Sequence, residues 1–207
     1  MTQIKICGVN DAAGFDAIVE IGADYVGFNF FPPSPRYVTP EDAASLSARH
    51  AGGPRRVGLF VNPAEADIEA ALAAIRLDIL QLYVAPARAA GLRARFGIPV
   101  WRAVGVAATA DLPTGMAGAD GLLIEAKAPK EATRPGGNAR TFDWSLLSGW
   151  TPPGPWALAG GLDAGNVAAA IAATGAPVVD VSSGVELSKG KKDPALIRAF
   201  AAAVRAG

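Results

Sequence analysis

Cysteine and histidine are almost missing from this chain of 207 residues, which has one of each, Cys7 and His50. A single cysteine excludes a disulfide framework within the chain, and this favours a reducing, cytoplasmic setting. One cysteine and one histidine also cannot supply the ligands of a His/Cys metal site, so we expect no bound metal.

Long apolar runs and an excess of either charge are missing as well. No stretch of 18 apolar residues is free of charged side chains, so we expect no membrane span. The first 15 residues contain neither the basic nor the apolar segment of a signal peptide. The 19 basic and 19 acidic side chains give a formal net charge of zero, which argues against nucleic-acid binding but leaves room for a small anionic ligand.

The sequence does contain a regular alternation of short apolar segments with longer, alanine-rich amphipathic ones. We predict strands at residues 3–7, 24–30, 55–61, 78–82, 99–104, 120–125, 155–159 and 177–182. We predict helices at residues 11–22, 40–50, 64–76, 87–96, 108–117, 143–149, 163–174 and 193–206. This alternation indicates an α/β fold with a parallel sheet. Eight units fit a single (β/α)₈ TIM barrel over residues 1–207 better than an open doubly wound sheet.

Residues typical of helix ends support these boundaries. Those at predicted starts are Asp11, Thr39, Pro40, Asn62, Pro63 and Asp163. Those after predicted ends are Gly22, Gly97 and Gly175. The segment 108–117 is the least regular helix prediction, because Pro113 and Gly115 interrupt it.

Cys7 ends the first predicted strand, in KICG. The active site of such barrels lies at the carboxyl ends of the strands. Alternation puts Lys5 and Cys7 on one face of this strand and Ile4 and Ile6 on the other, so we expect the first two to point into the barrel. Lys5 is then expected to lower the pKa of the Cys7 thiol. A buried, inert cysteine is the alternative.

Three further charged side chains lie at or after the ends of predicted strands. Glu125 ends the sixth strand and Asp180 lies in the eighth. Each is either a general acid or base or a member of an ion pair, with Lys127 and Lys130 close to Glu125 in sequence. Arg36 follows the proline-rich FFPPSP, whose stiffness suits a carboxylate or phosphate anchor. The alternative is a solvated loop arginine.

The segments AGGLDAGN and DVSSGVE follow the last two predicted strands and precede helices. Their small residues include Gly160, Gly161, Ser183 and Gly184. Loops at these two positions commonly form the phosphate site of a (β/α)₈ barrel, because glycine lets backbone N–H groups approach an anion. Ordinary tight turns are the alternative.

The motifs KICG, GFNFFPPSPRYV, VGLFVN, LQL, RPGGN, FDW, LAGGL and DVSSGVE occur in this order over nearly the whole chain. Together they resemble the phosphoribosylanthranilate isomerase family of tryptophan biosynthesis. The resemblance implies a (β/α)₈ barrel that binds a small phosphoribosyl substrate and needs no metal or organic cofactor. It also implies an Amadori rearrangement of N-(5-phosphoribosyl)anthranilate to 1-(2-carboxyphenylamino)-1-deoxyribulose 5-phosphate.

The same resemblance implies roles for individual residues. Cys7 is the general base that removes the proton at C2, and Glu125 stands where the family has an aspartate as general acid. Arg36 binds the anthranilate carboxylate and Asp180 the sugar hydroxyls, and Tyr83 contacts the substrate in place of the family's usual histidine. The phosphate is bound by Gly160, Gly161, Ser183 and Gly184.

The chain departs from the family pattern at four positions around this site. Tyr83 and Val84 replace a His-Gly pair after LQL, Glu125 replaces the aspartate, and Ala139 replaces a glycine. We expect an active isomerase with a compensated site. A weakened or non-catalytic phosphosugar-binding relative is the alternative, and a shifted substrate, such as an aminoaldose phosphate of the histidine pathway, is a third hypothesis. We expect a monomer without a nucleic-acid or membrane partner.

Overall fold

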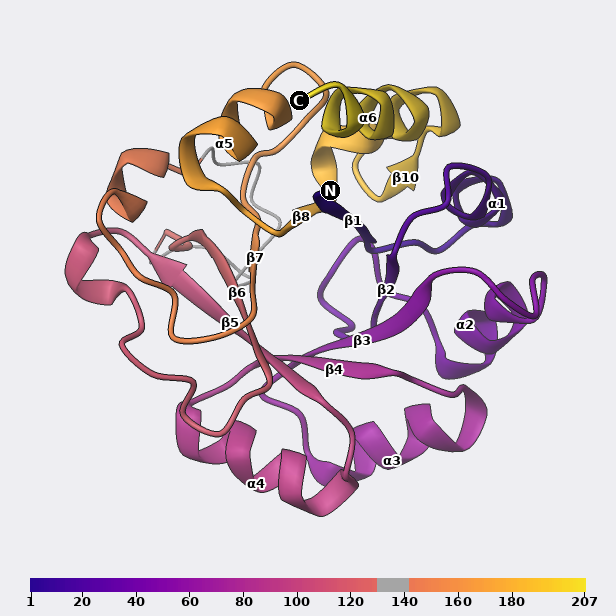
Figure 1. Ribbon diagram of the computed structural model, residues 1–207. Coiled ribbons are helices and arrows are strands. Elements are labelled where there is room, and N and C mark those ends of the chain that lie inside the picture. The colour runs from indigo at the N-terminus through magenta and orange to yellow at the C-terminus, as the bar shows by residue number, and fades with distance from the viewer. Residues whose placement is uncertain (130–141) are drawn as a thin grey trace.

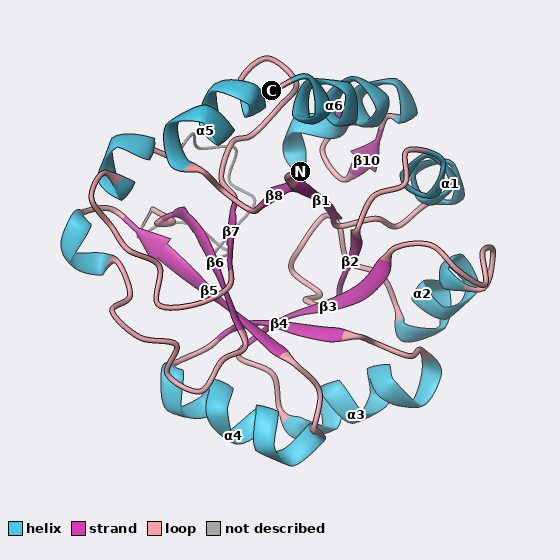
Figure 2. Cartoon of the chain, in the orientation of Figure 1, coloured by secondary structure: helices cyan, strands magenta, loops and turns pink. Residues whose placement is uncertain are grey.

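Strands β1 to β8 close into a parallel barrel in sequence order (Figures 1 and 2), which confirms the barrel over the open sheet. This computed structural model describes residues 1–129 and 142–207, so Lys130 and Ala139 lie outside the described residues. The strands are β1 Gln3–Cys7, β2 Tyr25–Asn29, β3 Arg55–Val61, β4 Ile79–Tyr83, β5 Val100–Val106, β6 Gly121–Ala126, β7 Trp156–Leu158 and β8 Val178–Val181. The barrel closes where β1 pairs with β8, with Lys5 opposite Asp180.

Helices surround the barrel on its outside, as Figure 1 shows. They are α1 Ala12–Glu20, α2 Pro40–Ser47, α3 Glu65–Ala74, α4 Pro86–Phe96, α5 Val167–Thr174 and α6 Pro194–Ala206. Two of the predicted starts are confirmed, because Asp11 accepts a hydrogen bond from the Gly14 N–H and Thr39 accepts one from the Asp42 N–H. Gly97 and Gly175 end α4 and α5 in the left-handed conformation.

Two predicted helices are wrong. Only short 3₁₀ helices form there, η1 Thr109–Asp111 and η2 Trp144–Leu147, and in Figure 1 they appear as short coils, η1 near the end of β5 and η2 next to α5. Pro113 cannot donate a helical hydrogen bond just after η1. Gly149, at φ 75°, turns the chain after η2.

Two predicted helix starts are also wrong. α3 begins at Glu65, and Asn62 instead adopts a left-handed conformation at φ 44°. α5 begins at Val167, because Asp163 forms a turn in which its side chain accepts from the Gly165 N–H at 2.8 Å. Asparagine and aspartate readily form such turns, so their presence did not identify the helix start.

A hairpin that the sequence did not predict follows β8. After the 3₁₀ helix η3 (Ser183–Val185), strands β9 (Glu186–Ser188) and β10 (Lys191–Lys192) pair antiparallel before α6 begins. The short, mostly polar sequences ELS and KK of these strands lack the apolar or β-branched run that predicts a strand.

The core has two layers, one between strands and helices and one inside the barrel. The apolar side chains inside the barrel are those of Tyr25, Val57, Ile79, Leu123, Ala157, Ala159 and Val178. Further along the same inward faces lie buried polar side chains, including Lys5, Gln81, Glu125 and Asp180. Polar groups kept out of water need partners or a ligand, so this region is where a site is expected.

The described residues contain no helix long and apolar enough to cross a membrane. Nor does this part of the chain contain a group of three or more His, Cys, Asp and Glu side chains arranged to hold a metal ion.

Candidate active site

A buried ion pair lies at the centre of the candidate site. The Lys5 ammonium, which is fully buried, donates to the Asp180 carboxylate at 2.8 Å. Burial lowers the pKa of Lys5, but the charges of Asp180 and Cys7 outweigh it, so the net shift is upward. The inward orientation predicted for Lys5 is therefore confirmed.

Glu125, at the end of β6, has a strongly perturbed carboxyl group. Burial raises its pKa to about 8, the charge of Asp180 adds to the rise, and the Tyr83 hydroxyl and Lys5 oppose it. The ion pair with Lys127 that the sequence left open does not form, because Lys127 pairs with Asp111 at 3.3 Å. A carboxyl group with such a pKa is protonated at neutral pH and can donate a proton.

Cys7 is buried at the end of β1, and its environment differs from the expectation in one respect. Burial raises the pKa of the thiol, although Lys5 and Lys192 both act to lower it. Lys5 does lower the pKa of Cys7 as expected, but the net shift is upward, because burial and the charge of Asp180 together outweigh the two ammonium groups. Without Lys5, the pKa of the buried Cys7 thiol would be higher still.

Tyr83 and Val84, the departures at the end of β4, fit without backbone strain. The Tyr83 hydroxyl interacts with the Glu125 carboxyl group, and burial raises the pKa of Tyr83 well above its usual value. Among the described residues, the only non-glycine residues with positive φ are Asn62 and Ala117. Val84 therefore does not have to copy a glycine turn, and it packs on the core between strands and helices.

Arg36 is buried, so the solvated alternative for this residue is wrong. Its Nε donates to Glu186 Oε1 at 2.6 Å and its Nη2 donates to Oε2 at 2.9 Å. Gly8, at φ 73°, lies directly against it, and a Cβ there would be 2.6 Å from Arg36 Cδ. The glycine of KICG thus lets the guanidinium side chain pack beside the end of β1.

The loops after β7 and β8 meet each other, as a shared anion site requires. A Cβ on Gly184 would overlap the carbonyl oxygen of Leu162, so only glycine permits this contact. Asn166 braces the β7 loop, accepting from the Asp163 N–H and donating to the Gly161 carbonyl, both at 2.9 Å. Within residues 1–129 and 142–207, the backbone N–H groups of Gly160, Gly161, Ser183 and Gly184 donate to no acceptor. Partly buried N–H groups without an acceptor are suited to bind a phosphate.

Sequence reasoning gave no role to three polar residues whose side chains are buried in this region: Gln81, Glu186 and Lys192. Glu186 and Lys192 belong to the unpredicted hairpin, and the run KGKKD does not reveal which of its lysines turns inward. Gln81 is 1% exposed, and neither atom of its amide has a hydrogen-bond partner in the described part of the chain. Its position inside LQL, two residues before Tyr83, was the available signal.

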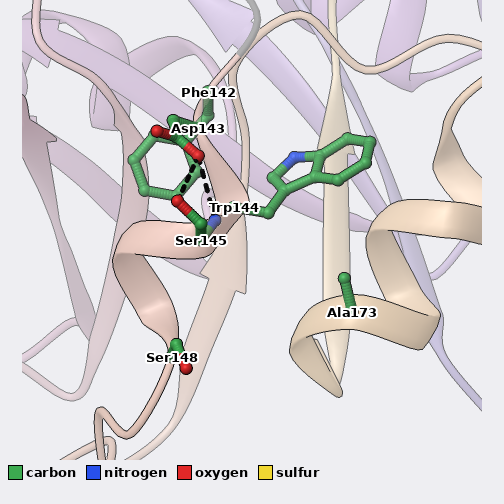
Figure 3. Close-up of a pocket in the computed structure, with 6 residues that line it drawn as sticks. All are labelled: Phe142, Asp143, Trp144, Ser145, Ser148 and Ala173. Carbon is green, nitrogen blue, oxygen red and sulfur yellow. Dashed lines mark hydrogen bonds between the residues drawn. The ribbon is translucent and has the colours of Figure 1, made fainter.

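A surface pocket, shown in Figure 3, lies away from these residues. It is lined by Phe142, Asp143, Trp144, Ser145, Ser148 and Ala173. The Asp143 carboxylate accepts from both the N–H and the hydroxyl of Ser145. None of the predicted site residues contributes to this pocket, and we assign it no role.

Known proteins resemble this chain over its full length. The sequence model of the N-(5'-phosphoribosyl)anthranilate (PRA) isomerase family matches residues 4–203. The N-(5'-phosphoribosyl)anthranilate isomerase of Granulibacter bethesdensis is 56% identical over 206 residues, which are 99% of each chain.

Solved structures agree with the sequence match. Phosphoribosyl anthranilate isomerase from Thermotoga maritima superposes with a TM-score of 0.83 at 34% identity, covering 100% of both chains. Another solved isomerase, in complex with reduced 1-(o-carboxyphenylamino)-1-deoxyribulose 5-phosphate, has a TM-score of 0.81, the same identity and the same coverage. Sequence and fold together show that this chain belongs to the phosphoribosylanthranilate isomerase family.

Proposed function

We propose that the chain converts N-(5'-phosphoribosyl)anthranilate to 1-(2-carboxyphenylamino)-1-deoxyribulose 5-phosphate, with Cys7 as general base and Glu125 as general acid. One observation carries the proposal. A carboxyl group with a pKa of about 8 and a thiol flanked by Lys5 lie in one buried cluster at the carboxyl end of the barrel. Two groups with separate proton tasks in one water-poor site suit an acid-base isomerisation.

The reaction proceeds through two proton transfers. Glu125 protonates the ribose ring oxygen as the C1–O bond breaks, and the nitrogen lone pair forms the C=N bond of an iminium. The Cys7 thiolate then removes the proton at C2, and the electrons of that C–H bond form C1=C2 while the C=N pair returns to nitrogen. The enolamine tautomerises to the ketone, so the product is an isomer of the substrate.

Arg36 and Asp180 orient the substrate in this proposal. Arg36 binds the anthranilate carboxylate, since a guanidinium offers planar donors that match a carboxylate. Asp180 accepts from the hydroxyls of the opened sugar while it keeps its ion pair with Lys5. Tyr83 holds the Glu125 carboxyl group by the contact between the two side chains.

The phosphate binds to the two loops that follow β7 and β8. Gly160, Gly161, Ser183 and Gly184 direct their backbone N–H groups at it, and the close packing of Gly184 on Leu162 keeps the two loops together. Backbone donors need no charged side chain to hold a phosphate, which suits a chain with no net charge.

Loss of anthranilate fluorescence on incubation with the natural substrate tests the activity. We expect turnover by the purified protein and rescue of a tryptophan auxotroph that lacks this enzyme. Binding of the reduced product analogue without turnover by folded protein would overturn the proposal and leave the phosphosugar-binding alternative. Turnover of a histidine-pathway aminoaldose phosphate, but not of the anthranilate, would identify a shifted substrate.

A further inference from the structure

The hairpin formed by β9 and β10 links three parts of the candidate site through buried charges. The Glu186 carboxylate accepts four hydrogen bonds: two from Arg36, one from Lys192 at 3.0 Å and one from the Gly190 N–H at 3.1 Å. The side chains of Arg36, Glu186 and Lys192 are at most 5% exposed. Charge-assisted hydrogen bonds in such a dry setting hold their partners in one arrangement.

Lys192 extends this network to the strand that carries the phosphate loop. Its Nζ donates to the carbonyl of Ser182 at 2.9 Å and lies 3.3 Å from the Ser182 hydroxyl. That hydroxyl donates to the carbonyl of Cys7 at 3.0 Å. Ser182 directly precedes Ser183 and Gly184, so Lys192 is one contact away from both the phosphate loop and the end of β1.

The hairpin also contacts the loop that carries Arg36. Gly190, at its turn, packs against the carbonyl of Pro35. The hairpin therefore holds Arg36 at two points: Gly190 packs on the preceding residue, Pro35, and Glu186 binds the guanidinium group. The Glu186 carboxylate is thus shared by two cationic side chains, Arg36 and Lys192.

We infer that Glu186 and Lys192 are positioning residues that fix the guanidinium of Arg36 relative to the phosphate loop. The hairpin thereby selects ligands that carry a carboxylate and a phosphate at a set separation. This inference rests on the roles proposed above for Arg36 and the phosphate loop. Neither hairpin residue is assigned a proton transfer, although the charge of Lys192 acts on the Cys7 thiol.

Binding of two ligands to variants tests the inference. The reduced product analogue carries both anionic groups, whereas ribulose 5-phosphate carries the phosphate alone. For Glu186→Gln we expect at least about a tenfold loss of affinity for the analogue, since a guanidinium displaced by about 1 Å binds poorly. We expect little change for ribulose 5-phosphate. Lys192→Met should weaken both ligands, because Ser182 is released.

Matched controls separate positioning from general damage. Lys191→Met removes the same charge from the neighbouring, exposed lysine, and we expect both affinities to be unchanged. In the double variant Arg36→Ala and Glu186→Gln, the second change should add no further loss of analogue affinity. Should Glu186→Gln not fold, Glu186→Asp retains the charge on a shorter side chain and should still weaken the analogue selectively.

The outcomes distinguish this inference from the assignment on which it rests. If Arg36→Ala leaves analogue affinity unchanged, the proposed role of Arg36 is wrong. If Arg36→Ala weakens the analogue but Glu186→Gln does not, or if Glu186→Gln weakens both ligands equally, the positioning role of Glu186 is overturned.

Discussion

The Lys5 ammonium and the Asp180 carboxylate form a 2.8 Å ion pair across the seam where β1 meets β8. Both groups act on Glu125, and they act in opposite directions, since Asp180 raises its pKa and Lys5 lowers it. Because these two effects oppose each other, burial remains the dominant influence on the pKa of Glu125. A buried ion pair contributes little to stability by itself, but removing one member leaves the other charge uncompensated.

The thiol of Cys7 provides the most direct test of the base. In Cys7→Ala we expect turnover to fall to background, because no other described group near β1 replaces a thiolate. Affinity for the reduced product analogue should stay close to wild type, since Arg36 and the phosphate loop are untouched. Fluorescence turnover and calorimetric binding measure the two quantities. Residual turnover near the wild-type rate would show that another group removes the proton.

The pH dependence of kcat/KM should be bell-shaped, with its maximum on the alkaline side of neutrality. The active form carries the Cys7 thiolate together with the protonated Glu125 carboxyl group. Burial raises the pKa of Cys7, whereas that of Glu125 is about 8, so the rate should rise up to the lower of the two apparent pKa values and fall above the higher one. The two groups interact, so the apparent values belong to the pair. Rates measured across the pH range check this, and a maximum on the acidic side would contradict it.

Glu125 also predicts a pH-dependent stability. In the folded protein its pKa is raised from 4.5 to about 8. Between these values the unfolded chain has lost the proton that the folded chain retains, so this group makes stability fall as pH rises. Its cost at pH 7 is roughly 3 kcal/mol at most. We expect Glu125→Gln to raise the Tm at neutral pH.

The control for that prediction is the same pair of proteins at low pH. Near pH 4.5, the usual pKa of a glutamate, residue 125 is neutral in the folded state of both the wild type and the variant. Most of the cost of protonating Glu125 is then gone, so the difference in Tm should largely disappear. A Tm difference that is the same at both pH values would show that packing, and not protonation, is responsible.

We expect the unpartnered amide of Gln81 to lower the stability of the folded protein while serving the candidate site. An unpartnered buried amide group costs about 1–3 kcal/mol, and methionine has a similar size without that cost. Gln81→Met should therefore raise the Tm. Because Gln81 lies two residues before Tyr83 on the face that lines the barrel, we also expect kcat/KM to fall.

A matched change at Asn29 serves as the control for Gln81. Asn29 is also buried, but its amide donates to the Ser34 hydroxyl and accepts from the Phe31 N–H. Asn29→Leu should lower the Tm. Destabilisation by Gln81→Met of the same size would mean that the Gln81 amide has partners of its own.

The sequence predicted the barrel because period and length are local properties. Each of the barrel strands β1 to β8 lies within two residues of its predicted bounds, and Lys5 and Cys7 point inward as alternation requires. The helix predictions for residues 108–117 and 143–149 are wrong because amphipathic composition does not reveal where a neighbouring turn competes with the helix.

The site could be predicted only in part, since its partners are far apart in the chain. Arg36 and Glu186 are 150 residues apart, and no local pattern announces such a pair. The net pKa of Cys7 also depends on burial, which outweighs Lys5 only in the folded barrel. The monomeric state and the cytoplasmic setting stay predictions.

The general acid is the central claim, and turnover by Glu125→Gln tests it most directly. Wild-type protein should consume N-(5'-phosphoribosyl)anthranilate at neutral pH, and the variant should be slower by at least about a hundredfold, as expected when a general acid is lost. Both proteins should bind the reduced product analogue with similar affinity. Comparable rates for the two proteins would contradict the assignment of Glu125, and turnover by neither would contradict the proposed activity.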